Sequence, residues 1–326
     1  MRALPIGVPK LMVSTVASGD VGRYVGPADI MMMHSVADVQ GLNRITRAVL
    51  SNAAQAMIGM VRARRELQLT GSAGRRQGRS VEPERAAVGL TMFGVTTPAV
   101  QRISRALADD FDCLVFHATG VGGQAMENLV DTGQVVGVID LTTTEIADLL
   151  VGGELAATED RLEAFVRTGM PWVGAPGALD MVNFGPIASV PEAFREGRQL
   201  LAHNPEVTLM RTSAEENERI GRWIGAKLNR MQGPVRMLLP EGGLSALDAP
   251  GQPFHDPALT QILFNAIEAS VNRNSERQLI RLPMHINDPA FADEVVRAFQ
   301  AVHGIRRKRD ERNDRSNRDN RLRSLR

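Results

Sequence analysis

The sequence predicts an α/β fold built on a mostly parallel sheet. From residue 86 onward, apolar runs rich in β-branched residues alternate with segments of helical spacing, and few turn signals join two such runs as a hairpin does. Strands are expected at 86–92, 113–117, 135–139, 171–174, 207–210, 235–239 and 278–282, with helices between them and a last helix over 289–302.

The chain before residue 86 predicts a smaller, separate part. Residues 10–16 form an apolar run typical of a strand, and 43–65 carry the spacing of one long helix. Residues 68–85 are rich in Gly, Ser and Arg, a composition typical of a linker. We therefore expect a first α/β part over 1–67, a linker over 68–85, a second α/β domain over 86–304 and a tail over 305–326.

Composition excludes several classes of protein. With 326 residues, of which 43% are hydrophobic and 23% charged, the chain matches globular averages. No stretch approaches the roughly 18 uninterrupted apolar residues of a membrane span. Cys113 is the one cysteine, which excludes an internal disulfide and favours the reducing cytoplasm.

The net charge of +1 hides an uneven distribution. Residues 306–326 hold ten basic and four acidic side chains, which leaves the other 305 residues at −5. The folded part therefore lacks the basic surface typical of nucleic-acid binding. The Arg-rich tail contains little apolar material and is expected to be disordered.

In a parallel sheet, ligands bind beyond the carboxyl ends of the strands. Four titratable residues follow predicted strands there and are not at helix N-cap positions: His117, Asp140, Glu241 and His285. They are candidates for acid–base catalysis on a small organic acid or phosphate ester. The alternative is that they are ordinary polar loop residues. A metal site would require His117, His285 and carboxylates to meet in space, since no close pair of metal-binding residues occurs.

Residues 113–130 combine a strand, a Gly-rich turn and a helix. Gly120, Gly122 and Gly123 let a backbone approach a ligand closely, and the helix N-terminus that follows favours an anion such as phosphate or carboxylate. The spacing to Asp140 also satisfies a dinucleotide fingerprint, and a structural tight turn is the third reading.

Two further residues are candidates for charge chemistry. Arg211 follows a strand and could clamp a phosphate or carboxylate, or else pair with Glu215 or Glu216. Glu241 opens a second Gly-rich turn, where it is a candidate general base or metal ligand, or a surface carboxylate. The triplet 31–33 (Met-Met-Met) is expected to be core or interface packing.

Long ordered strings in the chain resemble a known family. GLTMFGVTTPAV (89–100), HATGVGGQAME (117–127), GALDMVNFG (177–185), LPEGGLSALDAPGQPFHDP (239–257) and HINDPAFAD (285–293) occur in order. Together with residues 4–45 they resemble an uncharacterised protein family that includes the N-terminal half of the tomato mosaic virus resistance protein. That domain is described as ATP-binding.

The resemblance implies two Rossmann-like parallel-sheet domains facing a cleft, with the first incomplete, because family members begin upstream of Met1. It implies a homodimer formed through the long helix and the Met-rich segment. On this basis we expect ATP or another phosphorylated ligand in the interdomain cleft. Gly120, Gly122, Gly123, Ser18 and Asp20 lie in matching motifs.

In that hypothesis Arg211 neutralises phosphate charge, and Asp20 or Glu241 holds Mg²⁺. The alternatives are the acid–base enzyme described above and a protein-interaction module without catalysis. Neither a membrane nor a nucleic acid is an expected partner.

Overall fold

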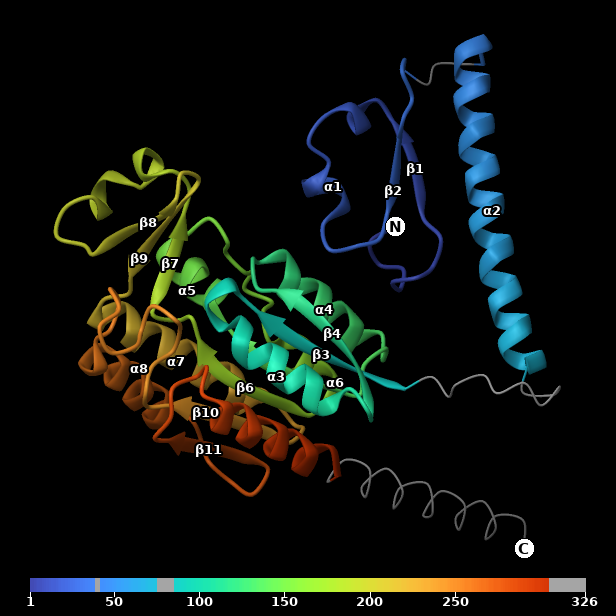
Figure 1. Ribbon diagram of the computed structural model, residues 1–326. Coiled ribbons are helices and arrows are strands. Elements are labelled where there is room, and N and C mark those ends of the chain that lie inside the picture. Colours follow the sequence, from blue (N-terminus) through green and yellow to red (C-terminus); the bar gives the residue numbers. More distant parts are fainter. Residues whose placement is uncertain (39–41, 75–84, 305–326) are drawn as a thin grey trace, which may run out of the picture. The chain divides into compact units, whose positions relative to one another are not determined.

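The computed structural model describes residues 1–38, 42–74 and 85–304 (Figure 1). The chain divides into two compact units, Met1–Arg85 and Ala86–Arg326, and each is described by itself. Residues 75–84 of the predicted linker and the predicted disordered tail from 305 onward lie outside the described residues.

Unit 1 contains two short parallel strands and one long helix. Strand β1 (Leu11–Ser14) pairs with β2 (Met31–His34), and α2 spans Arg44–Gly74. Between the strands lie η1 (Thr15–Ser18) and α1 (Gly22–Val25). The Met triplet therefore lies in a strand, and the long helix continues past its expected end at residue 65 into the predicted linker.

Unit 2 is built on a six-stranded parallel sheet. Its strands are β3 (Ala86–Met92), β4 (Phe111–His117), β5 (Gly137–Thr142), β6 (Trp172–Gly177), β10 (Val235–Pro240) and β11 (Arg277–Leu282). Each corresponds to a strand expected from the sequence, and every neighbouring pair is parallel, as predicted. The chain is thus an α/β protein with a six-stranded parallel sheet.

The strand order across the sheet is β4-β3-β5-β6-β10-β11. The chain thus makes β3 first, places β4 on one side of it, and places all later strands on the other side. The order reverses between β3 and β5, which makes this the topological switch point of the sheet.

Helices cover both faces of this sheet. Their bounds are α3 (Thr97–Leu107), α4 (Val121–Asp131), α5 (Thr144–Val151), α6 (Glu163–Thr168), α7 (Ala214–Arg230) and α8 (Pro257–Ser270), with a further helix over 289–304. On one face, α3 and the 289–304 helix bury Ile103 and Phe299 against Leu90 and Ile139. On the other face, Met126 of α4 lies against Gly89.

A second, antiparallel sheet of three strands was not predicted. Strands β7 (Met181–Phe184), β8 (Leu200–Asn204) and β9 (Val207–Arg211) pair in the order β7-β9-β8. The expectation that 207–210 belongs to the regular βα alternation is therefore wrong. A tight turn after Asn204 joins β8 directly to β9 as a hairpin. The short helices η3 (Ile187–Ser189) and η4 (Glu192–Phe194) precede it.

The sequence also predicts capping boxes at Thr142 with Glu145, at Ser213 with Glu216 and at Ser245 with Asp248, and their outcomes differ. Ser213 and Glu216 form the expected capping box of α7. Thr142 caps no helix; it ends β5, and its hydroxyl lies 2.8 Å from that of Thr96. Glu145, the expected partner of Thr142 in a capping box, is fully buried instead. Among the helices of the described ranges, none has both the length and the apolar character that a membrane span requires.

Two glycines allow α7 and α8 to pack closely. A Cβ at Gly221 would lie 2.6 Å from the Cβ of Ala266, and one at Gly225 would lie 2.4 Å from the Cβ of Ser270. Both distances are shorter than real carbon contacts, so any side chain there forces the helices apart. The small residues therefore fix the spacing of the layer that covers β10 and β11.

We expect Gly225→Ala to lower the free energy of unfolding of unit 2 by about 1–3 kcal/mol, because the added methyl group overpacks the helix pair. Urea unfolding followed by tryptophan fluorescence measures it, since Trp172 and Trp223, the only two tryptophans, both lie in unit 2. Gly304→Ala is the control, because nothing lies within 4 Å of a Cβ there. Equal stabilities of the two variants would show that α7 and α8 are not in tight contact.

Candidate functional site

Three loops meet at the carboxyl edge of the large sheet. The carbonyl of Val95, after β3, accepts hydrogen bonds from the amide of Ala246 (3.0 Å) and from Nδ2 of Asn287 (2.9 Å). Ala246 follows β10 and Asn287 follows β11, so strands from opposite halves of the sheet contribute to one edge. This is the edge at which the sequence predicts a site.

His117 lies at the exposed corner of this edge. It ends β4, and its ring stacks on that of Phe93, with centroids 5.3 Å apart and planes at 19°. Phe93 is half-buried, while His117 and the neighbouring Gly94 are exposed. A Cβ at Gly94 would meet nothing within 4 Å, so the space beside the stacked rings is open.

The Gly-rich turn already holds an anion from its own chain. The amide of Gly120 donates to Oε2 of Glu145 at 2.7 Å, and a Cβ at Gly123 would lie 1.8 Å from Oε1 of the same carboxylate. A Cβ at Gly122 would lie 1.8 Å from the carbonyl oxygen of His117. The turn thus has the close backbone approach that its sequence predicts, and a buried glutamate uses it. Whether these glycines also contact a ligand stays a prediction.

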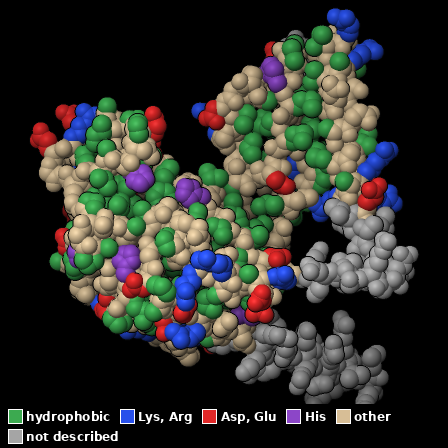
Figure 2. Space-filling view, viewed as in Figure 1, with side chains coloured by type: hydrophobic (Ala, Val, Ile, Leu, Met, Phe, Trp, Pro, Cys, Tyr) green, Lys and Arg blue, Asp and Glu red, His purple; other side chains and the backbone are tan. Residues whose placement is uncertain are grey.

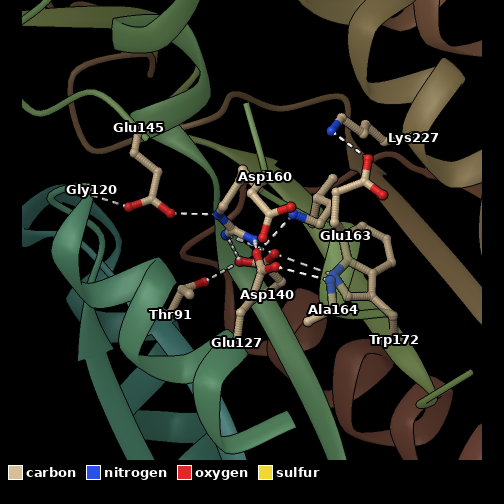
Figure 3. Close-up of polar contacts among 12 residues, drawn as sticks. Thr91, Gly120, Glu127, Asp140, Glu145, Asp160, Glu163, Ala164, Trp172 and Lys227 are labelled. Carbon is tan, nitrogen blue, oxygen red and sulfur yellow. Dashed lines mark hydrogen bonds and ion pairs between the residues drawn. The ribbon is translucent and has the colours of Figure 1, made fainter. Parts of the chain in front are cut away.

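Glu145 belongs to a buried cluster centred on Arg161 (Figure 3). The guanidinium pairs with Glu145 (2.5 Å), Asp140 (2.8 Å) and Glu127 (2.8 Å), and its side chain is only 1% exposed. Asp140 also accepts hydrogen bonds from the hydroxyl of Thr91 and the indole of Trp172. The cluster therefore ties the sheet to α4, α5 and the irregular segment before α6.

The charges in this cluster do not balance if all three carboxyls are ionised. Burial raises the pKa of Glu127 and of Glu145, although Arg161 opposes the shift in both. Desolvation therefore disfavours the ionised form of these two carboxyls, while the single guanidinium favours it. Leu162, next to Arg161, is held at φ 73° and donates its amide to Glu127 at 2.7 Å. Since such a φ is strained for a leucine, the cluster also fixes the local backbone.

Sequence reasoning missed Arg161 and Glu127. Glu127 carried a usable signal, because it lies on the face of α4 that buries Gly123, Met126 and Val130. A carboxylate within a helix's apolar face indicates a buried partner. No sequence signal indicated Arg161, because it lies in a turn before α6, where the sequence has no helical or strand periodicity.

A second buried cluster follows β6 and β10. Asp180 accepts a hydrogen bond from the hydroxyl of Ser245 (2.7 Å), and its other carboxyl oxygen is buried without a hydrogen-bond partner. Burial raises the pKa of Asp180 to about 7, and the nearby charge of Asp248 adds to the shift. Asp248 in turn accepts from the amide of Leu244. Ser245 and Asp248 therefore organise a buried loop and form no helix cap, contrary to expectation.

Arg211 stabilises the same region from inside. It is 4% exposed and donates to the carbonyls of Phe254 (2.9 Å) and Asp180 (3.3 Å) and to the hydroxyl of Thr212 (2.8 Å). The pairing expected with Glu215 or Glu216 does not occur: Arg198 pairs with Glu216 instead. The proposed neutralisation of ligand charge by Arg211 stays a prediction, and these donors now serve the fold.

His285 and Glu241 also have defined partners. The ring of His285 accepts the amide of Asn287 at Nδ1, so Nε2 carries the proton and donates to the carbonyl of Ser245 (2.9 Å). Glu241 is exposed and pairs with Arg281 at 3.3 Å. The sequence predicts four candidates for acid–base catalysis: His117, Asp140, Glu241 and His285. Within the described ranges, none of the four hydrogen-bonds to another.

Ser18 and Asp20 lie in unit 1, after β1. The hydroxyl of Ser18 donates to the carbonyl of Thr15, and Asp20 accepts the amide of Gly22. Within the described part of the chain, no group of three or more His, Cys, Asp or Glu side chains is arranged to hold a metal ion. Binding of Mg²⁺ by Asp20 or Glu241 stays a prediction.

The fold and its edge define an α/β protein with a doubly wound parallel sheet, a class in which ligands bind where the strand order reverses. Comparison with known proteins then gives the family. Residues 1–66 match the N-terminal domain, and 85–303 the C-terminal domain, of an uncharacterised protein family (UPF0261). The chain belongs to this family, which confirms the resemblance noted in its sequence.

Relatives occur in bacteria and in a plant. A UPF0261 protein of Rhizobium meliloti is 55% identical over 302 residues, covering 93% of this chain and 72% of that protein. One from Clostridium tetani is 48% identical over 293 residues, covering 90% and 69%. The ToMV resistance protein Tm-1 of tomato, Solanum lycopersicum, is 44% identical over 299 residues, covering 91% of this chain and 38% of the tomato protein.

We expect Arg161→Leu to lower the free energy of unfolding by about 3–5 kcal/mol, because it leaves three buried carboxyls without their counter-charge. The matched control is Arg167→Leu. Arg167 also pairs with two carboxylates, Asp131 and Asp160, but its side chain is 45% exposed. Exposed pairs contribute about 0–1 kcal/mol. Urea unfolding followed by tryptophan fluorescence compares them, and similar losses for both would contradict a special role of the buried cluster.

We expect stability to fall as pH rises through about 7, in part because of Asp180. The folded state keeps a proton on this carboxyl up to about pH 7, whereas the ordinary pKa of an aspartate carboxyl is 3.8. The contribution is complete below the lower value and is lost as pH rises through the upper one. Asp180→Asn removes this titration, so its unfolding free energy should change less between about pH 5 and about pH 8 than that of the wild type. Parallel pH profiles of the two proteins would show that Asp180 titrates normally in the fold.

Proposed function

We propose that the chain binds a phosphorylated small molecule, with ATP as the first candidate, at the carboxyl edge of its six-stranded sheet. The observation that carries the proposal is the stacked pair Phe93–His117, which faces open space next to the switch point between β3 and β5. Doubly wound sheets bind their ligands at that position.

The aromatic pair is suited to a planar ring. Bases stack on aromatic side chains with about 1–3 kcal/mol per base, largely independent of sequence. His117 is exposed, and Phe93 is held from below by packing against the small cluster that contains Val95 and Phe254. One ring is thus accessible and the other anchored, so the pair offers a rigid platform.

The N-terminus of α3 lies immediately after this platform in the chain. Helix α3 begins at Thr97, one short η2 turn (Gly94–Thr96) after Phe93. Pro98 in its first turn has no amide hydrogen, and the remaining first-turn amides have no partner within the helix and carry the positive end of the helix dipole. Phosphate groups bind at such positions, particularly where the loop before the helix allows close approach. Gly94 allows that approach here.

The neighbouring N-terminus of α4 is used differently, because Glu145 already supplies an anion to Gly120. We therefore place the phosphates at α3 and regard the Gly-rich turn as the structural wall of the site. This arrangement uses groups of unit 2 alone.

We expect the full chain to bind ATP in the presence of MgCl₂ by isothermal titration calorimetry. His117→Ala and Phe93→Leu should each weaken binding about fivefold or more, because they remove the stacking surface. Leucine at position 93 keeps the apolar packing, and thermal melts of each variant check the fold. His203→Ala is the matched control, since His203 is an exposed histidine on β8. An absence of heat with ATP, ADP, AMP and inorganic phosphate would refute the proposal, as would unchanged affinity in both variants.

A further inference from the structure

Strand β4 leaves one edge of the large sheet without a strand partner. It is the terminal strand in the sheet order, and it pairs with β3 alone, in unbroken register from Phe111 to His117. Its outward-facing amides and carbonyls therefore have no ladder partner among the described residues. Figure 1 shows this edge.

This edge lacks the features that normally prevent strand addition. Natural edge strands are guarded by lysines, prolines, bulges or very short length. Over its seven residues β4 has no lysine, arginine or proline, and Asp112 is its only carboxylate. Leu114 and Val115 point to opposite faces and are 36% and 45% exposed. An open, apolar edge of this length is suited to an added strand.

A groove of about 290 Å³ runs beside this edge, between β4 and α3. It is lined by Met92, Val100, Gln101, Ser104, Arg105 and Val115. Its floor at one end is apolar, and its wall along α3 becomes polar towards Arg105. An extended peptide that paired with β4 would direct every second side chain into it.

Arg105 gives the groove a charge preference. Its Nε donates to the carbonyl of Gln101, and no carboxylate pairs with its guanidinium among the residues the structure describes. Its neighbour Arg102, in contrast, is held by both carboxyl oxygens of Asp293, at 2.9 and 3.0 Å. Figure 2 shows basic side chains on the face that carries α3. A carboxylate is the complementary group for Arg105.

The apolar and basic parts of the groove set the spacing of a peptide that would bind there. The accessible apolar side chain is Val115, which is 45% exposed, and Arg105 supplies the charge. Successive side chains of an extended peptide point to opposite faces, so two that enter the groove lie at positions i and i+2. An apolar side chain beside Val115 and a carboxylate near Arg105 are therefore separated by a single residue.

We propose that the groove between β4 and α3 binds an extended peptide, which adds to the free edge of β4 and places an apolar side chain beside Val115 and a carboxylate near Arg105. The occupant is thus a segment of a partner protein with the pattern apolar-x-acidic. The order of the two side chains along the segment depends on whether it runs parallel or antiparallel to β4. This surface is an interaction site additional to the proposed ligand site at the carboxyl edge.

Fluorescence anisotropy with the full chain tests this directly. The probes are fluorescein-labelled Ser-Thr-Val-Thr-Glu-Thr-Ser and its reversed sequence, each beside a counterpart with Lys in place of Glu. We expect one of the two Glu peptides, forward or reversed, to bind. Its Lys counterpart should bind at least about tenfold more weakly, because it loses one charge-assisted hydrogen bond to Arg105. Arg105→Glu should reverse this preference. N-methylation of the amides that face β4 should abolish binding, and methylation of the alternate amides should not.

Two variants of β4 distinguish a loss of binding in the groove from a general effect of substitution in the strand. Val115→Lys places a charge in the groove and should weaken binding about tenfold or more, whereas the uncharged change Leu114→Thr, on the opposite face, should leave it within about twofold. Thermal melts confirm that both variants fold. Binding that ignores Arg105→Glu, or no binding of any peptide, overturns the proposal. Analytical ultracentrifugation tests whether a second copy of the chain covers the edge instead. A dimer that dissociates in Val115→Lys would overturn the proposal.

Discussion

The guanidinium of Arg161 is the point on which the centre of unit 2 depends. It lies among three carboxyls that come from β5, α4 and α5, and it is itself supplied by chain without regular structure. Removing the guanidinium leaves three buried carboxyls without compensation, so the elements that supply them are fixed to one another through Arg161. Hydrophobic packing covers the opposite face of the sheet, where Leu90 and Ile139 meet α3. Apolar packing thus contributes on both faces, since Met126 of α4 lies against Gly89, and the face that carries α4 adds a buried cluster of paired charge.

This cluster also explains why a motif typical of anion binding lies in a position closed to solvent. Glycines at 120, 122 and 123 permit the same backbone approach that a phosphate requires, and the buried carboxyl of Glu145 occupies it. The exposed ring of His117 lies at the start of the same turn, stacked on Phe93. The turn thus has the close backbone approach that its sequence predicts, and the carboxyl that fills it comes from a residue 25 positions away, while ligand binding by these glycines stays a prediction.

The parts that sequence could predict are those governed by local pattern. All six parallel strands, the long helix of unit 1 and the capping box at Ser213 follow from apolar runs and short-range spacing. The antiparallel sheet was missed because β7 is fully buried and β8 half exposed, so neither shows a clean alternation. The partners of Arg161 and the backbone carbonyls that accept from Arg211 could not be predicted, since they lie 16 to 45 residues away along the chain. The edge position of His117 was foreseeable from topology, but its stacking on Phe93 required the register of β3 and β4.

The order of strands has a consequence for how the sheet is assembled. β5 pairs with β3, β6 with β5, β10 with β6, and β11 with β10. Each strand therefore joins one that has already been synthesised, and none has to be inserted between two existing neighbours. Because a nascent chain emerges from its N-terminal end, the large sheet of unit 2 can be extended strand by strand in the order of translation. β3 is then the founding strand, which β4 flanks on one side while the opposite side grows.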